Sequence, residues 1–416
     1  MSVMKPLLLA ATFTYNSMVL PKREFGRWLR HELTCCGPVY VKFGQFVASR
    51  KDFFPYHITK ELANLQDNVD PMAFEDIINV LQQENVTCLE NMNPQPISVA
   101  SIGQVHTATI QDVRVCVKIQ KPQVDEQIED DLGALTTTLG VAFTLFPNSR
   151  TLSDMCDLLS QCTQTLEREL DYTTEANNLS EMREYMRECD IIVPRVVRSK
   201  STSRVLIMEY INANKLATCQ EGERVARTLS KGVAVVAIKY GYIHGDLHQG
   251  NIGFIGDKVV LYDCGSVIRI DKTIVRDLCS ALIVRDVDSI VSTLVGNNLV
   301  ALDVSNKELA LDKLRAFVTH VTTYTQHLNI QTLVQDISDD RFLNSGPMMF
   351  RTNADLLVLS RTFGLLEGTC KQLYPQFTYD QVFLDVVTQA DVMVLIDPRA
   401  IFRRGLYDVY SIVKIP

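Results

Sequence analysis

The amino-acid sequence predicts an α+β protein with two lobes and a helical extension at its N-terminal end. Its 416 residues exceed what one hydrophobic core usually supports. Apolar residues recur at helical spacing in the first part of the chain and again toward its end. Between these parts, short runs rich in β-branched residues indicate a sheet. We therefore expect a helical extension in residues 1–95, a lobe with a sheet and a long helix in 96–212, and a helical lobe in 213–416.

The extension is expected to contain four helices, because prolines and a Gly37-Pro38 pair interrupt an apolar helical pattern. A further apolar segment, residues 7–20, is too short to span a bilayer and is diluted by threonine, asparagine and serine. We expect it to form an amphipathic or packed helix, compatible with peripheral contact to a membrane, and we expect no transmembrane span. The four expected helices cover residues 25–33, 39–49, 57–65 and 73–84.

The middle of the chain has the pattern of a β-rich lobe. Two short apolar runs are joined by Gln111-Asp112, and two such residues between strands predict a hairpin. A long polar stretch with helical spacing follows, and then a buried strand. The rest of the chain is expected to be mostly helical. The expected elements are strands at 105–110, 113–119 and 204–211, one helix at 152–189 and a non-helical interruption at 242–267.

Bulk composition narrows the class of protein. A net charge of −8 and a pI near 5.5 give no basic footprint, so we expect no nucleic-acid partner. An apolar fraction of 46% and a charged fraction of 22% are ordinary for a folded protein and argue against disorder. The 11 cysteines have no regular spacing, which indicates a reducing compartment. We expect a cytoplasmic or peripheral-membrane location, and a mitochondrial one is compatible with the sequence.

The strongest chemical signal is a pair of polar loops in the second half of the chain. Asp246 and Asn251 are five positions apart, and Asp263 follows an apolar run and lies two positions before a glycine. These residue types and spacings match the catalytic and metal-binding loops of kinases. We expect Asp246 to be catalytic, and Asn251 and Asp263 to bind magnesium through oxygen atoms. A polar turn between buried strands is the alternative, and His244 and His248 are expected to brace the loop rather than react.

Residues further upstream would complete a nucleotide site. A loop of small residues containing Ala100, Ser101 and Gly103 lets backbone amides approach phosphate oxygens. Lys118 lies near the end of the next strand, where it can pair with the α- and β-phosphates, so we expect it to bind ATP and to act in catalysis. Taken singly, these residues also fit a simple hairpin turn and a surface lysine.

Two helical glutamates, Glu169 and Glu175, follow the lysine. On the one helix expected here, six residues separate them, so they point in different directions and need different partners. A solvated acidic helix face is the alternative interpretation. The order of loop, lysine, glutamate, catalytic loop and metal-binding aspartate is nevertheless that of a two-lobed protein-kinase-like fold, which is the fold that we expect.

Two short motifs carry a resemblance to a known family. Lys42 and Gln45 occur in Lys-Phe-Gly-Gln, and Glu169 and Asp171 in Glu-Leu-Asp. These resemble the K-x-G-Q and E-x-D motifs of the UbiB or ADCK family of atypical protein-kinase-like ATPases, and the likeness covers residues 37–375. The resemblance implies a regulatory role for all four residues, with Lys42 facing Glu169 and the extension covering the active-site cleft. It also implies that Glu175 pairs with Lys118, and that adenine is held at Met208, Glu209 and Tyr210.

By the same resemblance, the chain is an ATPase or phosphotransferase that uses ATP and Mg²⁺. The family implies a role in isoprenoid-quinone (ubiquinone) or related lipid metabolism, with lipid or quinone-biosynthesis proteins as partners. The sequence departs from the family in its nucleotide loop, which is less rich in alanine, and in Cys264, which replaces the phenylalanine of the usual metal motif.

Three other functions fit part of the pattern. An aminoglycoside- or choline-kinase-like small-molecule kinase shares the catalytic loop but lacks the K-x-G-Q segment. A nucleotide-binding pseudokinase scaffold would bind ATP without turnover. A hydrolytic metal centre would recruit His244, Asp246, His248 and Asp263, although the other histidines form no partner cluster in the sequence.

Overall fold

The computed structural model describes residues 12, 15, 16, 19–49, 56–65, 71–100, 102–147, 150–302, 306–324, 350–379, 382, 385 and 386. Internal contacts divide the chain into two units. Unit 1 comprises Met1–Asn177 and Pro194–Ile211, and unit 2 comprises Asn178–Val193 and Asn212–Pro416. The division of the chain into three segments stays a prediction, because residues 1–95 and most of 96–212 fall within unit 1.

The sheet of unit 1 has four antiparallel strands in the order β1-β2-β3-β5. The expected hairpin is confirmed, and it joins β2 to β3. Gln111 and Asp112 at its turn both have positive φ, 50° and 64°, as a two-residue type I′ turn requires. The strands are β1 Ser98–Val99, β2 Gly103–Ile110, β3 Val113–Gln120 and β5 Val205–Glu209.

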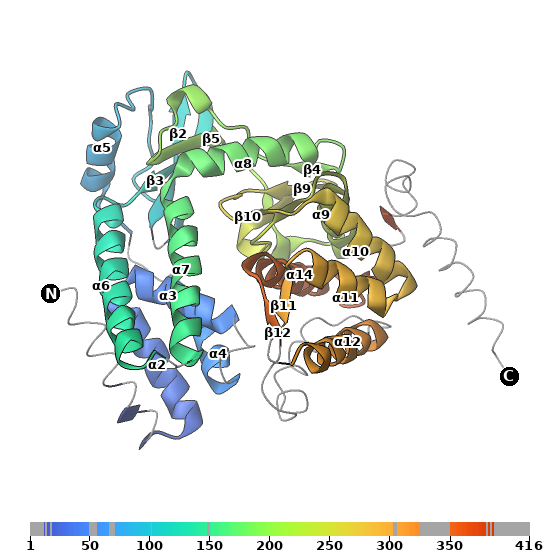
Figure 1. The fold of residues 1–416 in the computed structure, drawn as a ribbon. Coiled ribbons are helices and arrows are strands. Elements are labelled where there is room, and N and C mark those ends of the chain that lie inside the picture. The colour runs from blue at the N-terminus through green and yellow to red at the C-terminus, as the bar shows by residue number, and fades with distance from the viewer. Residues whose placement is uncertain are drawn as a thin grey trace. The chain divides into compact units, whose positions relative to one another are not determined.

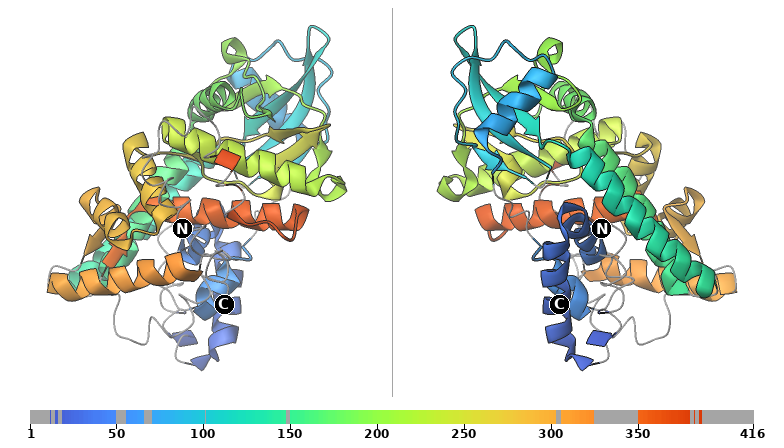
Figure 2. Two further views of the ribbon diagram at one scale, coloured as in Figure 1. Left: turned by 90° about the vertical axis from the view of Figure 1, so that its right-hand side faces the viewer. Right: turned by 90° about the vertical axis from the view of Figure 1, so that its left-hand side faces the viewer.

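Helix α5, Phe74–Gln83, packs on one face of this sheet, which Figure 2 shows in its right-hand view. Strand β3 contributes Val115, Val117 and Ile119 to the apolar cluster beneath the helix. Because successive side chains of a strand point to opposite faces, the neighbouring Lys118 and Gln120 face away from α5. The cluster is Ile77, Val80, Leu81, Ala108, Val115, Val117, Ile119, Val205 and Ile207.

The four expected helices of the extension are confirmed, each within a few residues of its predicted bounds. Helices α2 and α4 approach closely at Gly26, where a Cβ atom would collide with the carbonyl oxygen of His57. Trp28 stacks on Phe25, with ring centroids 5.7 Å apart. The helices are α2 Lys22–Cys36, α3 Pro38–Ser49, α4 Tyr56–Leu62 and α5 Phe74–Gln83.

The expected single helix at 152–189 is wrong: two helices, α7 and α8, meet at Asp171. The Asp171 carboxylate accepts hydrogen bonds from the Thr173 backbone N–H at 2.9 Å and from its hydroxyl at 2.7 Å, so it caps the second helix and ends the continuity. A further helix, α6, which the sequence analysis did not anticipate, lies beside α7 (Figure 1). The bounds are α6 Val124–Leu145, α7 Arg150–Leu170 and α8 Tyr172–Tyr185.

Unit 2 is mainly helical. Strands β7, β8 and β9 fall in the expected interruption and β10 begins at its end, whereas β4, β6, β11 and β12 lie outside it. A four-stranded sheet has the order β4-β9-β8-β6, and β10 pairs with β7. The chain leaves these strands through the loops that carry the predicted catalytic and metal-binding residues. The strands are β4 Ile191–Ile192, β6 Asn214–Lys215, β7 Tyr242–His244, β8 Ile252–Ile255, β9 Lys258–Leu261 and β10 Val267–Arg269.

Helix α9 packs against β7, and α10 and α11 enclose a second apolar cluster with α12. Within the described residues, no helix is long and apolar enough to cross a bilayer. The remaining elements are α9 Gly222–Tyr240, α10 Lys272–Val284, α11 Val287–Gly296, α12 Lys307–Tyr324, α14 Ala354–Leu373, β11 Val300–Leu302, β12 Phe350–Thr352, and the short 3₁₀ helices Arg198–Lys200, Leu216–Thr218 and Gln249–Asn251.

Candidate functional site

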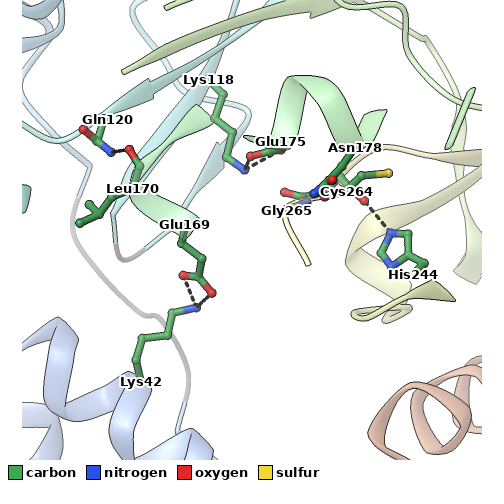
Figure 3. A network of polar contacts seen from close by, with 11 residues as sticks. Lys42, Lys118, Gln120, Glu169, Leu170, Glu175, Asn178, His244, Cys264 and Gly265 are labelled. Atoms are coloured by element: carbon green, nitrogen blue, oxygen red, sulfur yellow. Dashed lines mark hydrogen bonds and ion pairs between the residues drawn. The ribbon is translucent and has the colours of Figure 1, made fainter. Parts of the chain in front are cut away.

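In unit 1, the predicted lysine and glutamate form a close ion pair (Figure 3). Lys118 Nζ donates to both carboxylate oxygens of Glu175, at 2.9 and 2.7 Å. The side chains are 14% and 6% exposed, so neither charge is well solvated. The ammonium also lies 5.3 Å from the centre of the Tyr172 ring, within cation–π range. A cation is therefore held in a fixed place by a rigid strand and the first turn of a helix.

A second ion pair in unit 1 joins the extension to α7. Lys42 Nζ lies 3.2 Å from Glu169 Oε2 and donates to Oε1 at 3.4 Å. The break at Asp171 places Glu169 on α7 and Glu175 on α8, so each glutamate has its own lysine. The predicted pairing is present, but on two helices rather than one. Gln45, by contrast, donates to the backbone carbonyl of Leu65 at 3.2 Å, within the extension itself.

The predicted nucleotide loop is a tight turn before β2. The Ala100 backbone N–H donates to the Gly103 carbonyl at 2.8 Å. A Cβ atom at Gly103 would collide with the Tyr172 hydroxyl and lie 2.6 Å from the Ile119 carbonyl oxygen, so only glycine fits there. Ser101, which we also expect to bind ATP, lies outside the described residues.

The predicted adenine segment lies at the end of β5. Met208 is buried and pairs in register with Cys116 of β3. The Glu209 backbone N–H donates to the Arg195 carbonyl at 2.8 Å. The guanidinium of Arg114 lies 3.9 Å from the centre of the Tyr210 ring. Each of the three predicted residues thus has a defined contact within unit 1. Their contact with adenine stays a prediction.

In unit 2, His244 joins the two polar loops. Its Nε2–H donates to the Asp263 carbonyl at 2.6 Å, and its Nδ1 accepts from the Asp246 backbone N–H at 3.0 Å. Burial lowers the pKa of His244, and the hydrogen bond to Asp263 offsets part of this shift. The ring therefore stays neutral, and its Nδ1 can accept a hydrogen bond. His244 is therefore a brace, and with both ring nitrogens bound to backbone it has none left for a metal. That arrangement argues against the hydrolytic metal centre.

The predicted magnesium ligands are held by further backbone contacts. Asn251 donates from Nδ2 to the Asp246 carbonyl at 3.2 Å, which leaves its side-chain oxygen as the atom that can ligate a cation. Asp263 Oδ1 accepts from the Gly265 backbone N–H at 2.7 Å. Carboxylate and amide oxygens are the donors that magnesium prefers, so these residues fit the ion. His248 lies 3.5 Å from Asp246 Oδ2 and accepts from the Gly250 N–H, which again is a bracing role.

Two buried polar residues near the predicted site residues escaped the sequence analysis. Asn178, buried on α8, donates to the Cys264 carbonyl at 3.0 Å and so holds the residue next to Asp263 (Figure 3). Gln120, buried at the end of β3, donates to the Leu170 carbonyl at 2.7 Å. The sequence contained a signal for each. Asn178 stands three positions after Glu175 on a helix, and Gln120 stands two positions after Lys118 on a strand. At these spacings, both residues of a pair lie on the same face of their element.

A strand lysine paired with a helical glutamate, and an aspartate–asparagine loop braced against a second aspartate, define the protein-kinase-like class. A profile of the ABC1 atypical kinase-like domain matches residues 64–293, more than half of the chain. The chain therefore belongs to the ABC1 atypical kinase-like family.

Curated relatives carry names from the same family. The chain is 28% identical over 392 residues to Protein ACTIVITY OF BC1 COMPLEX KINASE 7, chloroplastic, of Arabidopsis thaliana, over 89% of this chain and 55% of the relative. It is 32% identical over 249 residues to a probable protein kinase UbiB of Xylella fastidiosa, over 57% of this chain and 45% of the relative. The chain thus spans about half the length of these relatives.

Among solved structures, the complex of Rv3197 with erythromycin from Mycobacterium tuberculosis is similar in fold. The TM-score is 0.53, with 23% sequence identity over 79% of this chain and 87% of that one. At that identity the likeness concerns the fold alone. Together with the family match, it confirms the kinase-like α+β fold expected from the sequence.

Proposed function

We propose that this chain is an atypical kinase-like enzyme that binds Mg-ATP and either hydrolyses it or transfers its terminal phosphoryl group. The observation that carries the proposal is the buried ion pair between Lys118 and Glu175. A lysine held in place on a central strand supplies a fixed cation for the α- and β-phosphates of ATP. Glu175 orients that cation and prevents the lysine from reaching solvent.

The unit 2 loops supply the remaining roles in this proposal. Asp263 and Asn251 would hold the metal through oxygen atoms, and magnesium, when bound, neutralises charge on the phosphate oxygens. Asp246 would orient the acceptor hydroxyl or water and accept its proton. His244 keeps Asp246 and Asp263 in fixed relation through their backbones, so that catalysis rests on positioning and on charge stabilisation.

We further propose that the acceptor is water or a lipid-linked small molecule in isoprenoid-quinone metabolism, rather than a protein side chain. Family membership and the UbiB names of relatives support the pathway. The ion pair of Lys42 with Glu169 supports the exclusion of large substrates, because it fastens the extension to the helix that precedes Glu175. We also propose that such a lipid-linked acceptor reaches the site at a membrane surface.

The decisive experiment titrates the purified chain with ATP, with and without magnesium, by calorimetry, and measures phosphate release in parallel. We expect magnesium-dependent binding and slow hydrolysis, and we expect Asp263→Asn to reduce turnover at least about 100-fold, as loss of a metal ligand does. Asp257→Asn, an exposed aspartate paired with Arg224, is the matched control. Unchanged ATP hydrolysis in Asp263→Asn would overturn the assignment.

The pseudokinase alternative is distinguished in the same titration. Magnesium-dependent binding without phosphate release, in the presence of lipid vesicles or a quinone-precursor phenol, would favour a nucleotide-binding scaffold over an enzyme. Absence of any nucleotide binding would reject both.

A further inference from the structure

The strand that carries Lys118 makes a second contact with the helical region that follows it. Gln120 ends β3 and is 1% exposed, and its backbone N–H donates to the Arg204 carbonyl at 3.0 Å. Its side-chain Nε2–H donates to the carbonyl oxygen of Leu170 at 2.7 Å. Leu170 is the last residue of α7, where backbone carbonyls have no partner within the helix. The glutamine therefore satisfies an acceptor that the helix end leaves open.

The acceptor of that bond lies at the junction of two functional helices. Glu169, which pairs with Lys42, immediately precedes Leu170, and Asp171 immediately follows it. The Tyr172 backbone N–H, at the start of α8, donates to the Ser203 carbonyl at 2.9 Å. The junction is thus attached at two positions, Leu170 and Tyr172, the first of them through the Gln120 side chain.

We propose that Gln120 is a positioning residue for Lys118: it clamps the junction between α7 and α8 to β3 and so holds Glu175 in register with the lysine. The inference rests on the proposed nucleotide-binding function for its catalytic meaning, but its geometry lies wholly within unit 1. Lys118 and Gln120 are two residues apart on one strand, so they share a face. Lys118 contacts Glu175 in the first turn of α8, and Gln120 contacts Leu170 at the end of α7.

The same clamp links the two ion pairs. Both Glu169 and Glu175 lie within five residues of Leu170, on opposite sides of the break at Asp171. A rotation of the junction would therefore move both carboxylates relative to their lysines. The Gln120 bond opposes that rotation, because its partner is the backbone of the junction and not a flexible side chain (Figure 3).

The test compares two substitutions that keep the shape of the side chain. Gln120→Met removes the donor and fills the same volume, and Gln120→Glu places an anion against the Leu170 carbonyl. Gln104→Met is the matched control. Gln104 is also 1% exposed and lies on the neighbouring strand β2, but its side chain contacts the Met72 backbone N–H and His106 instead.

The first readout is the rate at which an N-hydroxysuccinimide ester acylates Lys118, without nucleotide, followed by peptide mass spectrometry. An amine bound to a buried carboxylate is shielded from the reagent. We expect the rate at Lys118 to rise about fivefold in Gln120→Met, the equivalent of one net hydrogen bond, and further in Gln120→Glu. The rate at the exposed Lys60 should stay constant in all variants, and Gln104→Met should leave the rate at Lys118 within about twofold.

The second readout is the dissociation constant of Mg-ATP, which we expect to rise about fivefold in Gln120→Met while the unfolding midpoint falls no more than in Gln104→Met. The third is a double-mutant cycle with Glu169→Gln, whose effect on the Lys118 rate should shrink when Gln120 is already methionine. Equal Lys118 rates in wild type, Gln120→Met and Gln120→Glu would overturn the proposal, as would equal effects of the two methionine variants. Because acylation needs no nucleotide, a chain that fails to bind ATP would reject the proposed function and leave this test intact.

Discussion

The two units hold their functional groups by different means. In unit 1, Lys118 and Lys42 are fixed by ion pairs with glutamates, on regular strands and helices. In unit 2, Asp246 and Asp263 lie on loops, and backbone hydrogen bonds through His244 fix them. Removing one member of an ion pair leaves the other charge stranded, whereas removing the brace frees a loop. The comparison teaches that substitutions at the lysine–glutamate pairs of unit 1 should act through charge and those at the histidine brace of unit 2 through geometry.

The largest effect on stability is expected at the buried pair. Lys118→Met leaves the Glu175 carboxylate buried without its main partner, so the free energy of unfolding should fall by about 3–5 kcal/mol. The double substitution Lys118→Met with Glu175→Met should recover most of that loss but no nucleotide binding. Denaturant titration of the three proteins measures the difference. A double variant as unstable as the single one would show that charge is not what the pair contributes.

A smaller loss of stability is expected when the unit 2 brace is removed. His244→Leu keeps the site buried but leaves the Asp263 carbonyl and the Asp246 N–H without that partner, which costs about 1–3 kcal/mol. Turnover should fall more steeply than stability, because both loops lose their fixed relation. The control is His31→Leu, an exposed histidine on α2 that lies outside the predicted site, with an expected change of about 0.5 kcal/mol or less. Equal effects of the two variants on turnover would reject the bracing role.

Acid should reveal a buried histidine in each unit. Burial lowers the pKa of His244 in unit 2 and of His106 in unit 1 below the ordinary value of 6.5. The unfolded chain then binds more protons than the folded one once the pH falls below about 6.5, so stability is complete above that pH and is lost on acidification. Each histidine contributes a slope of at most about 1.4 kcal/mol per pH unit. Between pH 7 and 5, the free energy of unfolding should vary less with pH in His244→Leu than in the wild type. An unchanged pH dependence would contradict the lowered pKa of His244.

The smallest effect on stability is expected at the more exposed pair of unit 1. Lys42 and Glu169 are 20% and 24% exposed, so Lys42→Ala should lower the free energy of unfolding by about 1 kcal/mol or less. If the extension limits access to the site, Lys42→Ala should change turnover or nucleotide preference more than it changes stability. A thermal-shift screen of nucleotides with and without magnesium measures both quantities, and identical nucleotide profiles in wild type and variant would argue against a regulatory role.

Local signals made much of the fold predictable. The hairpin at Gln111 and Asp112 follows from turn residues that tolerate positive φ, and the helices of the extension follow from prolines that interrupt an apolar period. Helix α6 escaped because its later turns are uncharged and rich in threonine, so no polar face marks it. The break at Asp171 escaped because the sequence analysis assigned this aspartate to the E-x-D motif of one continuous helix, although an aspartate can also cap a new helix by accepting from a backbone N–H two positions later.

The chemistry of the site was predictable where residue type and spacing carried it. The pairing of Lys118 with Glu175 and of Lys42 with Glu169 was expected, and both pairs are present. The partner of Gln45 was not anticipated, nor were the contacts of Asn178 and Gln120, because each binds a backbone carbonyl. Any residue offers such a carbonyl, so residue spacing could indicate Asn178 and Gln120 as candidates but could not identify their partners.

The stacked pair of Trp28 and Phe25 allows the extension to be followed by tryptophan fluorescence. Trp28 is the sole tryptophan of the chain and lies on α2, so intrinsic fluorescence excited at the red edge of the absorption band reports that helix alone. Its emission can be followed during heating beside circular dichroism, which averages over all helices. If the extension detaches before the rest of the protein melts, the fluorescence change will come first, and the helices around Lys42 will be seen to form a separate cooperative unit.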